Sequence, residues 1–72
     1  MNTKIFERFG RRLKELRENN NLTQEDLAGL VNVHQTYIGK LETGKANPSL
    51  KLIYKLSSAL KVSLHVFFEF EK

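Results

Sequence analysis

The chain has 72 residues, with 12 Lys and Arg against 8 Asp and Glu, which gives a formal net charge of +4. A chain of this length forms one domain, residues 1–72, whose core is too small to enclose a substrate cleft as well, so we do not expect an enzyme. It contains no cysteine, which excludes disulfides and thiolate metal sites, and the small positive charge weakly favours a polyanion as partner.

The first predicted helix spans about residues 3–19. Its apolar side chains recur at steps of three and four residues, the spacing of one helix face. They are Ile5, Phe6, Phe9, Leu13 and Leu16. Gly10 interrupts this pattern, at a cost of about 1 kcal/mol against Ala unless another segment packs closely there. The three asparagines at 19–21 are typical of a helix end.

A second predicted helix begins after Thr23, a residue type that caps helix N-termini. Leu22 can pack on Leu27 across this start, in the geometry of a hydrophobic staple. Further along, Leu30 and Val31 continue the inward stripe that the spacing predicts.

Asn32 comes next, and asparagine enters left-handed backbone space at low cost, so we expect the chain to reverse there. A second periodic run then extends from Val33 through Ile38 to Leu41. Two short helices joined by a tight turn form a helix-turn-helix, here over about residues 23–42.

A loop is predicted over residues 43–48. Gly44 is well placed as a left-handed cap for the helix that ends near Glu42. Pro48 cannot continue a helix from before it, so a new element must begin after this loop.

Ser49 is expected to cap a fourth helix that runs to about residue 60. Its inward face would contain Leu50 or Leu52, followed by Ile53, Leu56, Ala59 and Leu60. Ser63 begins a last short helix over about residues 64–68. The sequence therefore predicts an all-α fold, one compact bundle of five helices.

One further pattern lies along the motif and the loop after it. It consists of Gln24, Ala28, the turn at Asn32, Ile38, Leu41-Glu42, Gly44-Lys45 and Asn47-Pro48-Ser49. This pattern resembles the lambda-repressor-like (Xre/Cro) DNA-binding domains, over about residues 9–68. The resemblance implies their compact five-helix fold and their function, sequence-specific DNA binding by a bacterial or phage-encoded transcriptional regulator.

Within that family the chain looks most like the small controller proteins of restriction–modification systems. The residues that carry this likeness are His34-Gln35-Thr36-Tyr37-Ile38, Glu42, Asn47 and Phe67-Phe68. Controller proteins bind palindromic operators as dimers and set the timing of endonuclease expression. The resemblance therefore implies an operator in double-stranded DNA as partner, with RNA polymerase as a second candidate partner.

The start of the second motif helix is where side chains reach base edges in the major groove. The residues expected to do so are Gln35, Thr36, Tyr37 and Lys40. Gln35 can pair bidentately with adenine, and Thr36 can place its methyl group on thymine. Lys40 can reach guanine or a phosphate, whereas Tyr37 can contact DNA or be partly packed. For Gln35 and Thr36 the alternative is an ordinary solvated helix face.

Contacts to the DNA backbone position such a helix without specifying sequence. Lys45, Asn47 and Ser49 follow the reading helix, so we expect them to meet the phosphates of one strand. For Lys45 the alternative is a solvated loop lysine. Gln24 lies in the first turn of its helix, where free N–H groups favour an anion. The resemblance implies that its side chain bridges a phosphate and Gln35.

The resemblance also implies an internal ion pair between Arg17 and Glu42. The pair would connect the end of the first helix to the end of the reading helix, and its role would be orientation. Breaking one side of such a partly buried pair can cost about 3 kcal/mol or more.

The C-terminal stretch contains more large apolar side chains than one short helix can bury. They are Val62, Leu64, Val66, Phe67, Phe68 and Phe70. We expect Leu64 and either Phe67 or Phe68 to complete the core. The others would form an exposed patch unless a second chain covers them.

A homodimer would cover this patch, and its symmetry would place two reading helices on half-sites about one DNA turn apart. We predict that it forms through residues 62–70, with Phe68 or Phe70 near the twofold axis. Val66 and His65 would also lie in the interface. The alternative is that all these aromatic side chains pack within one chain.

The remaining side chains give no sign of a cofactor or a membrane. His34 and His65 have no carboxylate or cysteine partners at metal-ligand spacing, and we expect the start of a helix for His34. No apolar stretch approaches the roughly 20 residues that span a bilayer, and the N-terminus lacks the apolar region of a signal peptide. These features predict a cytoplasmic protein.

Three classes of function are candidates for this chain. The first is a sequence-specific DNA-binding regulator, either a controller or a phage- or plasmid-type repressor. The second is an antitoxin-like module that uses the same fold to hold a protein partner. The third, an enzyme, lacks support because the sequence shows no nucleophile–base pair and no phosphate-cradling glycine loop.

Overall fold

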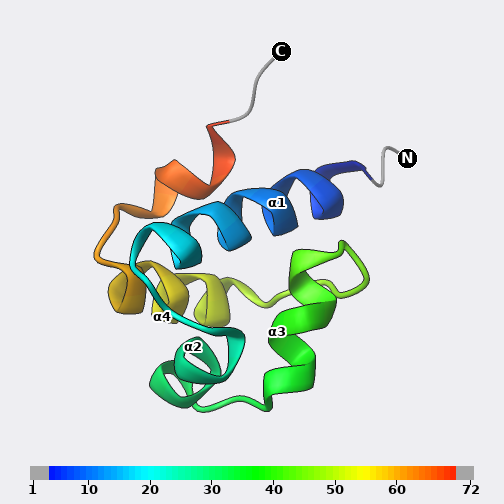
Figure 1. The fold of residues 1–72 in the computed structure, drawn as a ribbon. Coiled ribbons are helices and arrows are strands. Elements are labelled where there is room, and N and C mark those ends of the chain that lie inside the picture. Colours follow the sequence, from blue (N-terminus) through cyan, green and yellow to red (C-terminus); the bar gives the residue numbers. More distant parts are fainter. Residues whose placement is uncertain (1–3, 70–72) are drawn as a thin grey trace.

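The computed structural model describes residues 4–69 and contains four α-helices followed by one short 3-10 helix (Figure 1). The elements are α1 (Lys4–Asn19), α2 (Gln24–Val31), α3 (Gln35–Glu42), α4 (Leu50–Leu60) and η1 (Leu64–Phe68). No strand occurs within residues 4–69. The all-α prediction is confirmed, whereas the count of five α-helices is wrong by one.

The last segment, η1, differs from the prediction because its turns are closed by 3-10 hydrogen bonds. The Val66 N–H donates to Ser63 O at 3.1 Å, and the Glu69 N–H donates to Val66 O at 3.4 Å. Ser63, which was expected to begin an α-helix, makes no side-chain cap. A segment of five residues gains few α-helical hydrogen bonds, so the tighter 3-10 turn competes well.

Helix α1 packs against α3 and η1. Its buried apolar side chains are Phe9, Leu13 and Leu16. Ile5, which was predicted in the same inward stripe, is 41% exposed, and Phe6 is half-buried. Both lie in the first turns of α1, at the margin of the fold in Figure 1, where fewer neighbours cover the stripe.

Gly10 marks the place where the backbone of α1 meets the end of α3. A Cβ atom added to Gly10 would overlap the carbonyl oxygen of Leu41 and lie 2.6 Å from that of Glu42. Both obstacles are backbone atoms, which cannot turn away as a side chain can. The close packing that would offset the cost of a mid-helix glycine is therefore present.

Helix α2 begins with a complete capping box. The Thr23 hydroxyl accepts from the Asp26 N–H at 3.0 Å, and the Asp26 carboxylate accepts from the Thr23 N–H at 2.9 Å. Leu27 and Val31 are buried as predicted, but Leu30 is 61% exposed and the prediction for it is wrong. Leu30 lies about 100° around the helix from Val31, outside the narrow stripe that an eight-residue helix turns toward the core.

The predicted reversal at Asn32 is confirmed. Asn32 adopts φ 60° and ψ 49°, and its N–H donates to Ala28 O. The next N–H, from Val33, donates to the same carbonyl at 3.0 Å. This left-handed residue ends α2 and turns the chain toward α3.

Helix α4 is capped as predicted, since the Ser49 hydroxyl accepts from the Leu52 N–H at 3.1 Å. Of the two alternatives for its first inward residue, Leu52 is buried and Leu50 is 70% exposed. Ser57 is also buried and was not expected; its hydroxyl donates to Tyr54 O at 2.7 Å. An internal backbone acceptor lets this polar side chain enter the core.

Phe67 from η1 closes the core beside α1. It is fully buried, and its ring centroid lies 5.2 Å from that of Phe9. Phe68 is 44% exposed and Leu64 is half-buried. The expectation that Phe67 or Phe68 completes the core is thus resolved in favour of Phe67.

Candidate nucleic-acid interface

Helix α3 turns one face to the core and one to solvent. Ile38 and Leu41 are buried, while Gln35, Thr36 and Lys40 are exposed. In Figure 1 the helix lies at the edge of the fold. A helix held by one face at the edge of a small domain is accessible to a major groove.

The first turn of α3 is set by His34. Its backbone is extended, with φ −75° and ψ 145°, and its Nδ1 accepts from the Thr36 N–H at 3.1 Å. His34 therefore acts as the N-cap, in agreement with the helix-start position expected for it. The cap determines that Gln35 and Thr36 occupy the exposed N-terminal turn.

Tyr37 is the least accessible of the four predicted base-contact residues. It is half-buried and packs against the core, whereas Gln35, Thr36 and Lys40 are exposed. Of the two alternatives for this residue, partial packing is what the structure contains. A contact from its hydroxyl to DNA stays a prediction.

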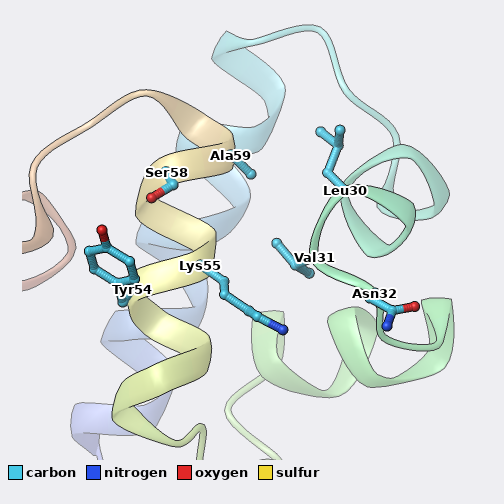
Figure 2. A pocket seen from close by; sticks show the side chains of 7 residues that line it. All are labelled: Leu30, Val31, Asn32, Tyr54, Lys55, Ser58 and Ala59. Carbon is cyan, nitrogen blue, oxygen red and sulfur yellow. The ribbon is translucent and has the colours of Figure 1, made fainter.

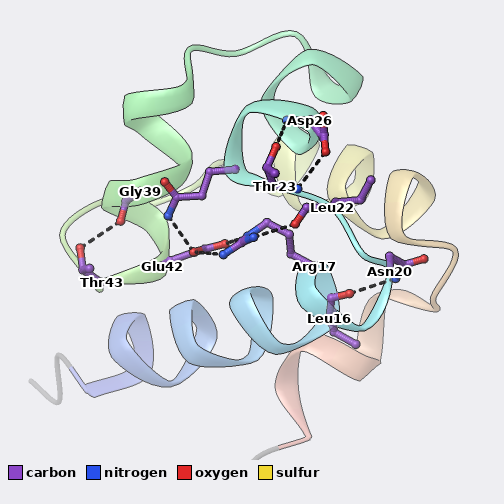
Figure 3. A network of polar contacts seen from close by, with 10 residues as sticks. Leu16, Arg17, Asn20, Leu22, Thr23, Asp26, Gly39, Glu42 and Thr43 are labelled. Carbon is purple, nitrogen blue, oxygen red and sulfur yellow. Dashed lines mark hydrogen bonds and ion pairs between the residues drawn. The ribbon is translucent and has the colours of Figure 1, made fainter.

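A buried ion pair joins the end of α1 to the end of α3 (Figure 3). Arg17 donates through Nε to Glu42 Oε2 at 2.6 Å and through Nη2 to Oε1 at 3.1 Å. This bidentate hydrogen bond is the main reason that the pKa of Arg17 is raised above its ordinary value. The geometry is that of the strongest Arg–carboxylate pairs.

The Arg17 guanidinium makes a third hydrogen bond, to a second partner that the sequence did not indicate. Its Nη1 donates to the carbonyl oxygen of Leu22 at 2.7 Å, as Figure 3 shows. Leu22 lies in the connection between α1 and α2. A backbone acceptor has no residue-type signature, so no sequence pattern could have predicted it.

Gln24 also belongs to this network. Its Nε2 donates to Glu42 Oε1 at 3.0 Å, and the side chain is half-buried. The resemblance had implied that this amide bridges a phosphate and Gln35. The amide lies against the ion pair, a partner that no sequence pattern indicated, and its bridge to a phosphate and Gln35 stays a prediction.

Three of the four residues predicted to contact phosphates lie along the loop after α3 and at the start of α4. Lys45, Asn47 and Ser49 are all exposed. The Lys45 N–H donates to Lys40 O at 2.8 Å, which brings the backbones of these two basic residues together. Gly44, with φ +77°, forms the turn that makes this contact possible.

Comparison with known proteins identifies the motif. The family model for helix-turn-helix proteins (HTH_3) matches residues 13–67, which include α2 and α3. The chain belongs to this family. The resemblance found in the sequence is confirmed, and helix-turn-helix proteins of this family are DNA-binding transcriptional regulators, not enzymes.

Three relatives of this helix-turn-helix protein cover most of its length. An uncharacterized HTH-type transcriptional regulator of Archaeoglobus fulgidus is 44% identical over 61 residues, which are 85% of this chain and 86% of the relative. Control protein C.MunI of a Mycoplasma species is 40% identical over 67 residues, 90% of each chain. The structure of the restriction–modification controller protein C.AhdI from Aeromonas hydrophila matches with a TM-score of 0.85 at 41% identity, covering 88% of this chain and 96% of that one.

The predicted dimer residues of the helix-turn-helix protein have mixed exposure. Phe68 and His65 are exposed and Val66 is half-buried, while Phe70 lies outside the described residues. The carboxylate of Glu69 lies 3.1 Å from Nδ1 of His65. Two further apolar side chains, which the dimer prediction did not include, are exposed on α4; they are Leu50 and Tyr54, the latter at 64%.

A shallow groove lies between α2 and α4 (Figure 2). Its lining consists of Leu30, Val31, Asn32, Tyr54, Lys55, Ser58 and Ala59. In Figure 2 the Leu30 and Ala59 side chains face the gap between the helices, whereas the Tyr54 ring points away from α2. Leu30, which is unexpectedly exposed, therefore lies at this groove.

The described part of the chain contains neither a metal-binding cluster nor a membrane-spanning helix. Residues 4–69 contain no group of three or more His, Cys, Asp or Glu side chains that could hold a metal ion. Over the same range, every helix is too short or too polar to cross a bilayer.

Proposed function

We propose that this helix-turn-helix protein binds a palindromic operator in double-stranded DNA as a homodimer, as the controller of a restriction–modification system. The proposal rests on the two different faces of α3. Its first turn is exposed and polar at Gln35 and Thr36, while Ile38 and Leu41 anchor its other face. A helix that packs one face on the core and exposes a polar face is suited to bind in the major groove.

Base selection is assigned to the exposed face of α3. Gln35 donates and accepts one hydrogen bond each with adenine, and Thr36 packs its methyl group on thymine. Lys40, one turn further along, reaches guanine or a phosphate. Tyr37 is half-buried, so its hydroxyl would contribute only from the margin of this face.

Contacts to the DNA backbone are assigned to three exposed residues, Lys45, Asn47 and Ser49; Gln24 would also bridge a phosphate and Gln35. The exposure of all three and the closeness of Lys45 to Lys40 support this assignment. The Ser49 hydroxyl accepts from the Leu52 N–H, and its own O–H can donate to a phosphate. These contacts would set the register of α3 without selecting bases.

The homodimer is assigned to the exposed apolar side chains of η1 and α4. Phe68 and Tyr54 are large and more than two-fifths exposed, and Leu50 is exposed to a similar degree. Val66 and His65 of η1 would lie beside them. A twofold axis through this surface would repeat α3 on the second half-site.

The controller role is supported by the relatives. C.MunI is a control protein and C.AhdI is a restriction–modification controller protein. Each matches this chain over nearly its whole length at about two-fifths identity. RNA polymerase is the second partner in this proposal, since a controller acts on transcription of the DNA that it binds.

Selection of bound sequences from a random duplex pool tests the proposal. We expect enrichment of an inverted repeat whose half-site centres are about 10 base pairs apart. Failure to enrich any sequence would contradict sequence-specific binding, and a single unrepeated site would contradict the dimer. Tight capture of a protein together with weak binding to every duplex would instead favour the antitoxin-like alternative.

A further inference from the structure

The short helix η1 depends on its neighbours for its position. It has five residues, and the Ser63 side chain does not cap it. Hydrogen bonds in 3-10 turns have poorer geometry than those in α-helices, and so short a helix is marginal on its own. The contacts that hold η1 are therefore those with α1 and α4, against which it packs (Figure 1).

The first anchor of η1 is apolar. Phe67 is fully buried, and its ring centroid lies 5.2 Å from that of Phe9 in α1. Leu64, three residues before Phe67, is half-buried, and side chains three apart on a 3-10 helix lie on the same face. Apolar burial keeps this face of η1 on the core, but because it is non-directional it restricts the rotation of η1 about its axis only loosely.

The second anchor is a directional contact from Arg12 in α1. Its Nε donates to the carbonyl oxygen of Val66 at 2.9 Å, and its Nη2 lies 3.6 Å from Glu69 Oε1. Its Nη1 donates to Glu15 Oε1 at 2.6 Å, which holds the guanidinium on α1. The Arg12 side chain is 25% exposed. Because a hydrogen bond weakens steeply with angle, this contact restricts the rotation of η1.

The remaining face of η1 points away from both anchors. His65 and Phe68 are three residues apart and both are exposed, as expected for one face of a 3-10 helix. One side of Phe68 is covered by α1, since its ring centroid lies 6.0 Å from that of Phe9. The direction of this outer face is therefore determined once the other two faces are held.

We propose that Arg12 is a positioning residue for the homodimer. By fixing the rotation of η1 about its axis, Arg12 presents Phe68 to the second copy of the chain. The inference rests on the proposed function, which places η1 in the dimer interface. A segment that is already held in its bound orientation loses less freedom on association, so the dimer forms at lower protein concentration.

The test compares two variants that remove the same charge. Arg12→Met keeps an apolar stem against the protein but has no donor, and Arg11→Met is the matched control at the neighbouring, exposed position. Sedimentation over a concentration series gives the Kd of the dimer. Affinity is measured for the palindromic operator and for a duplex that contains one half-site. Circular dichroism and urea unfolding show whether each variant is folded.

We expect Arg12→Met to raise the Kd of the dimer by about tenfold and to weaken binding to the palindromic operator. Its affinity for the single half-site should equal that of the wild type, since α3 is unchanged. Arg11→Met should leave the Kd of the dimer as in the wild type. A residue that only stabilised the domain would not change the Kd of the folded dimer, which separates the two roles.

Three results would overturn the inference. Folded Arg12→Met with the wild-type Kd would show that η1 needs no such anchor. An equal rise in the dimer Kd for Arg11→Met would show that charge, and not position, is what matters. If the wild-type protein is a monomer at every concentration and on the palindromic duplex, the proposed homodimer itself fails, and this inference fails with it.

A measurement on the wild-type protein covers the case in which Arg12→Met does not fold. In protein diluted until sedimentation shows a monomer, the Nε proton of Arg12 should exchange slowly with solvent in NMR spectra, because it is bonded to Val66 O before the second copy arrives. Exchange as fast as that of a free arginine side chain would overturn the inference.

Discussion

At the scale of single residues, two glycines show how position decides the effect of a side chain. Gly10 is buried, and a Cβ there would meet the backbone of Leu41 and Glu42. Gly29 is exposed in α2, and a Cβ there would meet nothing within 4 Å. The same substitution should therefore have opposite signs at the two positions.

Gly10→Ala should lower the free energy of unfolding by about 1–3 kcal/mol or more, because α1 must move away from α3. Gly29→Ala should raise it by about 0.5–1 kcal/mol, because alanine favours the helix and no contact is disturbed. Urea unfolding of both variants measures the difference. Equal effects at the two positions would contradict the close approach of α1 and α3.

Gln35 and Lys45 separate reading of bases from binding of phosphates. Gln35→Ala should reduce discrimination at one base pair by about 1–3 kcal/mol, whereas Lys45→Ala should weaken binding to all duplexes alike. Binding to the operator and to random duplex, measured at two salt concentrations, distinguishes them. Equal losses on both duplexes for both variants would show that these roles are wrongly assigned.

Asp26 makes the capping box of α2 dependent on pH. Hydrogen bonds from the N–H and hydroxyl of Thr23 hold the pKa of Asp26 below its ordinary value of 3.8. A carboxylate whose pKa is depressed by folding stabilises the protein above its unfolded pKa and loses that effect as the pH falls through its folded pKa. The stability advantage of wild type over Asp26→Asn should therefore be constant near neutral pH and disappear as the pH falls below about 4. Urea unfolding across this range, at fixed ionic strength, provides the measurement; an advantage that persists at low pH would contradict it.

At the scale of helices, α1 and α3 are coupled by one bidentate ion pair rather than by apolar contacts alone. Arg17 and Glu42 are both buried, and each would be left without its main partner if the other were replaced. The pair connects the end of α1 to the end of α3, so its loss concerns the orientation of α3 as well as stability.

Arg17→Met should lower the free energy of unfolding by about 3–5 kcal/mol, because it leaves the Glu42 carboxylate buried and uncompensated. The double variant Arg17→Met, Glu42→Leu should be less destabilised than the single one, since no isolated charge is left. Urea unfolding of both variants and the wild type checks this order. A double variant that shows the sum of two large losses would contradict it.

At the scale of the whole molecule, large apolar side chains are exposed on α2, α4 and η1. Leu30, Leu50 and Tyr54 are each more than three-fifths exposed, and Phe68 is 44% exposed. Leu30 borders the groove between α2 and α4, whereas Tyr54 points away from it. The surface of α4 and η1 is therefore the natural candidate for a twofold interface.

Phe68→Asp should shift the protein from dimer to monomer, because a carboxylate would be buried in an apolar interface. Sedimentation at several concentrations measures the shift, and circular dichroism confirms folding. Ile5→Asp is the matched control, since Ile5 has a similar exposure on α1. A folded Phe68→Asp protein with unchanged dimer content would refute the assignment of the interface.

The sequence by itself determined the local features of this protein. The cap at Thr23, the reversal at Asn32 and the turn at Gly44 all follow from which residues tolerate a cap or a left-handed backbone. The helix-turn-helix follows from these signals and from the apolar spacing between them. Such features depend on a few neighbouring residues, so they can be read without knowing the rest of the fold.

Only the tertiary structure decided what depends on distant neighbours. The exposure of Leu30, the choice of Phe67 over Phe68 for the core, and the Gln24–Glu42 hydrogen bond each depend on which helix lies opposite. Periodicity gives the direction of a side chain around its own helix but not what it meets there. For that reason the location of the reading helix was predictable from sequence. Of the hydrogen bonds that hold it, the Arg17–Glu42 pair was expected and the Gln24–Glu42 bond was not.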